Sequence, residues 1–162
     1  MSMHAAITGW GMSVQSKVVT NEDLSKIVDT SDEWIVSRTG IRERHIVSVG
    51  ETTSTLAAAA GRTAMHMAGL TSDDIDMVIV ATFCPDRPLP ATACLVQAQL
   101  GLTRAAAFDI AAACSGFVYG LSIATSLIAT GMAKRILFCA ADVLSHYVNW
   151  KDRNTCVLFG DG

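Results

Sequence analysis

A chain of 162 residues is long enough for one domain with a hydrophobic core and too short for two ordinary ones. Hydrophobic residues make up 51% of it and charged residues only 17%, which predicts a globular protein with much apolar surface to bury. The net charge is −3 and no basic stripe is present, which argues against nucleic acid as a partner.

The five cysteines are widely spaced, odd in number and contain no C-x-x-C pair. This pattern argues against a disulfide framework and against a zinc site, so we expect no bound metal and a reducing compartment. No signal peptide precedes the first predicted strand, and no apolar run reaches membrane-spanning length. The expectation is a cytoplasmic α/β protein that makes no contact with a membrane.

The N-terminal third is predicted to begin with a strand and to continue with two short helices. Residues His4–Trp10 predict the strand, and a first helix is expected from Glu22 to about Asp29. The sequence Thr30–Glu33 has the pattern of a capping box, in which the Thr side chain accepts from the Glu amide and the Glu side chain accepts from the Thr amide. A second helix therefore begins there, and Thr39–Gly40 ends it.

Trp34 and Arg38 are four residues apart on that second helix and therefore share one face. The simpler interpretation is a tryptophan packed in the core with an arginine at its edge, and spacing alone favours it. The alternative is an aromatic plate beside a guanidinium, suited to a flat base and a phosphate. The segment Arg42–His45 that follows is predicted to be a solvated charged face.

The middle of the chain alternates helices with an apolar strand. A helix is expected over Ser54–Gly69, and Asp76–Thr82 predicts a central parallel strand covered on both faces. All three prolines of the chain lie in Phe83–Pro90, which predicts an extended loop at the end of the strand where α/β proteins place their ligand sites. A further helix is expected over Ala91–Leu100, and Gly101 ends it.

Cys114 is expected at the tip of a tight turn between the strand Ala105–Ile110 and a helix from Phe117 to Gly131. A thiol there would face the unpaired N–H groups and the positive end of the helix dipole, which favour the thiolate. Ala113 and Gly116 leave room for a substrate beside the sulfur. The alternative is a structural cysteine, since free Cys is among the most buried residue types.

Two more strands are predicted near the C-terminal end, over Lys134–Ala141 and Thr155–Phe159. Between them, residues 142–151 are expected to be irregular or briefly helical. Strands and helices thus alternate along the chain, which predicts an α/β fold with a mostly parallel sheet and helices on both faces.

Four motifs, in this order, resemble β-ketoacyl-acyl-carrier-protein synthase III: Thr30–Arg44, Glu51–Ser54, Ala111–Phe117 and Leu158–Gly162. The resemblance extends over the whole chain. It implies that residues 1–162 are the N-terminal half of a thiolase-like condensing enzyme, with a five-stranded sheet, and that the C-terminal half is absent from this chain. It also implies a homodimer for the complete enzyme.

The resemblance implies a decarboxylative condensation that begins fatty acid synthesis. An acyl group from acyl-CoA moves to the active cysteine, and malonyl-acyl-carrier protein then loses CO₂ and attacks the thioester. No permanently bound cofactor is implied, because acyl-CoA is a substrate. The resemblance assigns the nucleophile to Cys114. It places Trp34 and Arg153 on either side of the CoA adenine, and Thr30 and Arg38 against the nucleotide end.

Leu89 matches a position that reaches across the dimer to close the partner's acyl tunnel. Members selective for acetyl groups have a bulky aromatic residue there, so Leu89 predicts room for a longer or branched starter. The loop Cys84–Pro88 departs from the family's polar, small-residue pattern, which leaves the substrate preference open. The family's catalytic His and Asn lie in its second half, and none of the four histidines here matches that His.

Two other functions remain open from the sequence. The first is a synthase III-like starter-unit acyltransferase of polyketide or other secondary metabolism, which would have the same cysteine turn. The second is a non-catalytic interaction fragment. A helix terminus stabilises a thiolate by about 0.3–1 kcal/mol, whereas lowering a thiol pKa to about 7 requires about 2 kcal/mol. We therefore expect slow acylation at most from this half alone, and self-association through uncovered apolar surface.

Overall fold

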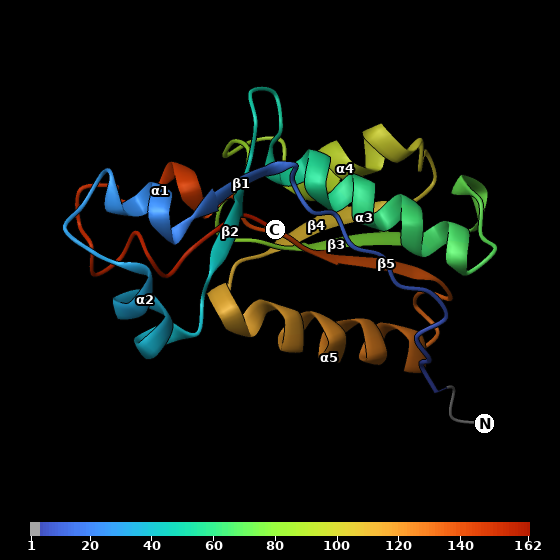
Figure 1. Ribbon diagram of the computed structural model, residues 1–162. Coiled ribbons are helices and arrows are strands. Elements are labelled where there is room, and N and C mark those ends of the chain that lie inside the picture. The colour runs from blue at the N-terminus through green and yellow to red at the C-terminus, as the bar shows by residue number, and fades with distance from the viewer. Residues whose placement is uncertain (1–3) are drawn as a thin grey trace. The chain divides into compact units, whose positions relative to one another are not determined.

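The computed structural model describes residues 4–162, which form an α/β structure of two compact units (Figure 1). The first unit contains the chain up to Ser13 together with Thr52–Asp142. The second contains Val14–Glu51 and Val143–Gly162. Each unit is therefore assembled from two segments that are distant in the sequence.

The first unit is built on a parallel sheet of three strands. Strand β3 (Met77–Ala81) lies in the centre, with β4 (Ala106–Ile110) on one side and β5 (Ile136–Ala140) on the other. Ile79 stands opposite both Phe108 and Phe138 in this register. The side chains of Val78, Ile79 and Val80 are completely buried, which confirms the central strand predicted from the apolar run.

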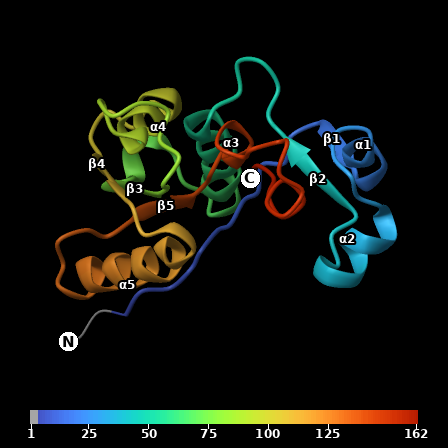
Figure 2. The same cartoon turned by 90° about the vertical axis from the view of Figure 1, so that its left-hand side faces the viewer.

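Helices cover both faces of this sheet, as the alternation of elements predicted. Helices α3 (Thr53–Met67) and α4 (Thr92–Leu100) lie on one face, and α5 (Gly116–Ala129) lies on the other (Figures 1 and 2). The predicted stop at Gly101 is confirmed, because this residue ends α4 in the left-handed conformation with φ 68°.

The expectation of a five-stranded sheet is wrong, since the parallel sheet has three strands. Residues 4–10 form no strand. They pack against α3 through glycine, because a Cβ on Gly9 would overlap the carbonyl oxygen of Ala64. The predicted strand Thr155–Phe159 is a run of turns, in which the amides of Thr155 and Cys156 both donate to the Asp152 carbonyl at 3.2 and 3.0 Å. These local bonds satisfy donors that a strand would have paired with a neighbour.

The second unit contains an antiparallel pair, β1 (Lys17–Thr20) and β2 (Glu43–Ile46). It also contains the short helices α1 (Asn21–Ser25) and α2 (Asp32–Thr39). Its core consists of four buried side chains, namely those of Leu24, Ile35, Cys156 and Val157. The described residues also contain three single turns of 3₁₀ helix, at Ser72–Asp74, Ala113–Ser115 and Leu144–His146, and an isolated antiparallel bridge between Val143 and Asp161.

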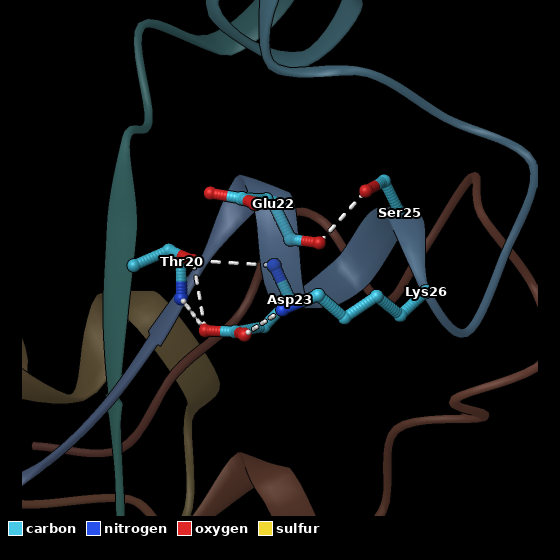
Figure 3. A network of polar contacts seen from close by, with 5 residues as sticks. All are labelled: Thr20, Glu22, Asp23, Ser25 and Lys26. Carbon is cyan, nitrogen blue, oxygen red and sulfur yellow. Dashed lines mark hydrogen bonds and ion pairs between the residues drawn. The ribbon is translucent and has the colours of Figure 1, made fainter.

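Helix α1 begins with a reciprocal cap (Figure 3). The Asp23 amide donates to the Thr20 hydroxyl at 3.1 Å, and the Thr20 amide donates to the Asp23 carboxylate at 3.1 Å. Lys26 contacts the same carboxylate at 2.9 Å. Hydrogen bonds from Lys26 and Thr20 lower the pKa of Asp23 to about 2.

The N-cap of α2 is Ser31, so the predicted capping box at Thr30–Glu33 is wrong by one residue. Ser31 has an extended backbone, with φ −143°, and its hydroxyl accepts from the Trp34 amide at 3.1 Å. Gly40 ends the helix in the left-handed conformation, as the sequence predicted. No helix among residues 4–162 is long and apolar enough to span a membrane.

Candidate functional site

Cys114 lies on the turn that joins β4 to α5, at the position the sequence predicted. The strand ends at Ile110, a single 3₁₀ turn covers Ala113–Ser115, and the helix begins at Gly116. Cys114 is exposed, whereas Cys139 and Cys156 are buried. Its thiol is therefore accessible to a substrate, unlike that of a cysteine packed in the core.

The backbone of this turn is unusually tight. Ala113, immediately before the cysteine, has φ 45°, a left-handed conformation that a residue with a Cβ rarely adopts. At the N-cap of α5, Ser115 makes no side-chain hydrogen bond to the first amides of the helix. No capping side chain accepts from the first amides of the helix, and within the turn the Ser115 and Gly116 amides donate to the carbonyls of Ala112 and Ala113.

Leu89 lies in the first unit on the proline-containing loop between β3 and α4. Its side chain is 83% exposed, compared with 43% for Phe83 at the start of the same loop. Three aspartates that the sequence analysis did not single out, Asp86, Asp109 and Asp142, hold the loop and its two ends. The sequence feature that could have identified such a residue is an aspartate just beyond the end of a predicted strand, as at Asp142.

The second unit brings together three of the predicted nucleotide-binding side chains. The Arg38 guanidinium lies 4.4 Å from the centre of the Trp34 ring, and that of Arg153 lies 4.8 Å from it. Arg153 is held there by donating to the Asp29 carbonyl at 2.8 Å. The shared face predicted for Trp34 and Arg38 is thus confirmed, and Arg153 joins it from a distant part of the sequence.

Trp34 combines the two interpretations that its spacing left open. Its side chain is half-buried and packs against the core of the second unit, while cationic groups lie over its ring. Thr30 is one residue before the N-cap of α2, and its buried hydroxyl oxygen has no hydrogen-bond partner among the residues the structure describes. These features suit a site for a flat, polar ligand.

Arg44 is not solvated, so the expectation of a solvated face over Arg42–His45 is wrong at this position. Only 5% of its surface is exposed. The guanidinium donates to the Val19 carbonyl at 3.1 Å, to the Asn21 side chain at 2.9 Å and to the Val157 carbonyl at 3.3 Å. Because the alternation of β2 turns Arg44 inward, its charge is compensated by these oxygens rather than by water.

Asp161, in the Gly-Asp-Gly motif, holds segments of the second unit together. Its carboxylate accepts from the amides of Val47 and Ser145, each at 2.8 Å, and from the Ser145 hydroxyl at 2.7 Å. Within residues 4–162, no group of three or more potential metal ligands is close enough to hold an ion. Cys114 and Leu89 thus belong to the first unit, and the arginine–tryptophan cluster to the second.

Comparisons with known proteins agree with the motifs. The family model described as 3-oxoacyl-[acyl-carrier-protein (ACP)] synthase III matches residues 108–162, which include Cys114. A curated relative from Roseiflexus sp. (strain RS-1), named β-ketoacyl-[acyl-carrier-protein] synthase III, is 62% identical over 162 residues. The match covers 100% of this chain and 49% of the relative. The chain therefore spans about half the length of the curated relatives it matches.

Solved structures show the same fold and the same share of length. The crystal structure of 3-oxoacyl-[acyl-carrier-protein] synthase III from Aquifex aeolicus VF5 superposes with a TM-score of 0.93 at 52% identity, over 96% of this chain and 50% of that one. The crystal structure of the priming β-ketosynthase of the R1128 polyketide pathway superposes with a TM-score of 0.96 at 33% identity, over 99% of this chain and 48% of that one. The chain is thus the counterpart of the N-terminal half of the 3-oxoacyl-[acyl-carrier-protein] synthase III family, with its thiolase-like fold.

Proposed function

We propose that this chain carries the acyl-accepting half of a 3-oxoacyl-[acyl-carrier-protein] synthase III that begins fatty acid synthesis. The observation that supports this most directly is the exposed Cys114 thiol at the start of α5, on a turn that the family model covers. The thiolate attacks the carbonyl carbon of acyl-CoA, the bond from that carbon to the CoA sulfur breaks, and CoA leaves as its thiol after taking up a proton.

The second step is the condensation. Malonyl-acyl-carrier protein loses CO₂, and the carbanion so formed attacks the acyl carbon on Cys114. The cysteine thiolate then leaves, and a 3-oxoacyl-acyl-carrier protein is released. The resemblance assigns decarboxylation to a His and an Asn in the family's second half. We therefore propose that Cys114 accepts the acyl group and that condensation requires the part of the relatives' length to which this chain does not align.

The nucleotide end of CoA is proposed to bind the second unit. Trp34 offers a ring for the adenine, and Arg153 and Arg38 offer guanidinium groups already at that ring. The Thr30 hydroxyl, which has no hydrogen-bond partner within residues 4–162, supplies a further polar contact. We further propose that the complete enzyme is a cytoplasmic homodimer, uses acyl-CoA and malonyl-acyl-carrier protein as substrates, and needs no resident cofactor.

A second candidate function is the priming condensation of polyketide assembly. It is supported by the TM-score of 0.96 with the R1128 priming ketosynthase and by Leu89, because the resemblance places a bulkier aromatic residue at this position in acetyl-selective members. The two candidates share acylation of Cys114 and differ in the acyl group and in the carrier protein that accepts it. A purely non-catalytic interaction role would involve neither.

Intact mass spectrometry after incubation with acetyl-, butyryl-, isobutyryl- and hexanoyl-CoA tests the proposal. We expect one acyl adduct that maps to Cys114 and is absent in Cys114→Ala. The preferred donor separates the candidates, because a strict preference for acetyl-CoA would exclude a longer starter. Absence of an adduct with every donor, in protein shown to be folded, would contradict the acyl-accepting role and leave the non-catalytic interpretation.

A further inference from the structure

The loop Phe83–Pro90, which carries Leu89, is fixed at its start by one carboxylate. Asp142, two residues beyond β5, accepts from the Thr82 hydroxyl at 2.8 Å. The same oxygen accepts from the amides of Phe83 and Cys84 at 3.0 and 3.2 Å. The backbone that leaves β3 is therefore tied to the neighbouring strand.

A second carboxylate fixes the far side of the loop. Asp109, on β4, accepts from the amides of Thr92 and Ala93, each at 2.7 Å. No side chain of α4 itself caps this helix, so Asp109 takes that part from the adjacent strand. Asp109 lies five residues before Cys114 on the segment that leads to the nucleophile, so the end of the loop is tied to that segment.

The middle of the loop is fixed by Asp86, whose carboxylate caps α3. One oxygen accepts from the Ser54 amide at 2.9 Å, and the other accepts from the Thr52 hydroxyl at 2.8 Å. The Ser54 hydroxyl also donates to Asp86, and in turn accepts from Gln99 on α4 at 2.9 Å. Asp86 thus connects the loop to two helices through a fully paired set of hydrogen bonds.

Leu89 lies between the Asp86 anchor and the Asp109 anchor, with 83% of its surface exposed. A loop of this length would otherwise be mobile, because its own apolar contacts are few. We propose that Asp86 is a positioning residue. It fixes the loop so that Leu89 is held in one place, and Leu89 in that place sets the length of the acyl chain that the enzyme accepts. This proposal rests on the proposed function, in which Leu89 closes an acyl tunnel.

The matched control is Asp74, which caps the 3₁₀ turn Ser72–Asp74 by accepting from the amide and hydroxyl of Thr71 at 2.9 and 2.8 Å. It makes the same kind of bonds as Asp86 but is on a different surface segment. Asp86→Ala and Asp74→Ala are compared in the complete natural polypeptide that carries this sequence. The measurement is the ratio of acylation rates of Cys114 by acetyl-CoA and hexanoyl-CoA in competition.

We expect Asp86→Ala to shift this ratio toward hexanoyl-CoA by about tenfold, the lower end of the effect of one methylene group in an apolar pocket. Asp74→Ala should leave the ratio unchanged. A change in both rates by the same factor in Asp86→Ala would show a general loss of structure and overturn the proposal. Should Asp86→Ala fail to fold, Asp86→Asn keeps an oxygen for the Ser54 amide but loses the oxygen that accepts from the Thr52 and Ser54 hydroxyls. A ratio equal to that of the natural protein in this variant would then count against the proposal.

Hydrogen exchange on the same samples separates this proposal from the proposed function. Asp86→Ala should speed amide exchange in residues 83–90 and at Ser54, and leave residues 71–74 unchanged. If the natural protein forms no thioester with any donor, the proposed function fails, and with it the assigned effect on acyl length. If the thioester forms but loop exchange is unaltered by Asp86→Ala, Asp86 does not position the loop.

Discussion

Gly116 and Ala81 are in near contact at the point where α5 begins. A Cβ on Gly116 would lie 3.1 Å from the Cβ of Ala81, the last residue of the central strand β3. The helix that starts two residues after Cys114 therefore lies so close to the sheet that a side chain on its first residue would require Ala81 or the helix to shift by a few tenths of an ångström. The position of the nucleophile is thus set by a glycine beside it.

Gly116→Val should destabilise the protein and displace the cysteine turn. The added side chain overpacks against Ala81 and should lower the free energy of unfolding by about 1–3 kcal/mol. It should also slow acylation of Cys114 by more than the loss of stability alone explains, because the cysteine turn must shift. Urea denaturation and the intact-mass assay measure the two effects. Gly162→Val is the control, since a Cβ there meets no atom within 4 Å.

The cysteines should differ sharply in reactivity. Burial raises the pKa of the Cys139 thiol to about 12, so at pH 8 it remains protonated as well as inaccessible. Cys114 is exposed and should be alkylated by iodoacetamide in the native protein. Peptide mapping after brief labelling measures both sites, and denatured protein serves as the control in which Cys139 also reacts. Equal labelling of the two in native protein would contradict this burial.

The three strands of the first unit could be predicted from the sequence because each is identified by residues within or next to it. The apolar run of β3 and the left-handed glycine after α4 each identify an element within a few residues. The segments 4–10 and 155–159 had strand-like composition, but a strand also needs a partner. Close glycine packing and local turns decided those segments, and neither can be seen without the fold.

Site residues could be predicted where a local sequence motif identifies them. They could not be predicted where their role depends on a hydrogen bond between distant segments. The exposure of Cys114 and the contact of Arg38 with Trp34 followed from the turn and the helical spacing. The inward orientation of Arg44 did not, because its three acceptors lie up to 113 residues away. An aspartate in a loop, such as Asp86, is similarly indistinguishable from a solvated one until the helix it caps is placed.

Arg153→Ala should weaken binding of acyl-CoA without affecting the fold. Loss of a guanidinium 4.8 Å from the Trp34 ring centre should raise KM for acyl-CoA by about tenfold and leave kcat nearly unchanged, since the group lies at the nucleotide end. Initial rates over a range of acyl-CoA concentrations measure KM and kcat separately. Arg135→Ala, at an exposed arginine 3.8 Å from Asp74, should have no effect on KM. A fall in kcat alone would contradict the nucleotide role.

The cap of α1 should depend on pH. The pKa of Asp23 is about 2 in the folded protein and 3.8 in an unfolded chain, so its ionised form stabilises the folded state above about pH 4. This contribution is lost as the pH falls through 2. Lys26→Met should raise the pKa of Asp23 toward 3.8, because it removes the largest cause of the shift. Carbon-detected NMR titration of the carboxylates measures it, with Lys17→Met as a control at an exposed lysine that is not part of this cap.

Arg44 also has a consequence for the order in which the protein forms during synthesis. Its guanidinium joins β2 to the Val157 carbonyl, and Asp161 binds the Val47 amide, so the second unit closes only once residues 157–161 have left the ribosome. The three parallel strands of the first unit are complete once residue 140 has emerged. The sheet should therefore assemble first, and the second unit should remain incomplete until Val157, the acceptor of Arg44, has been synthesised.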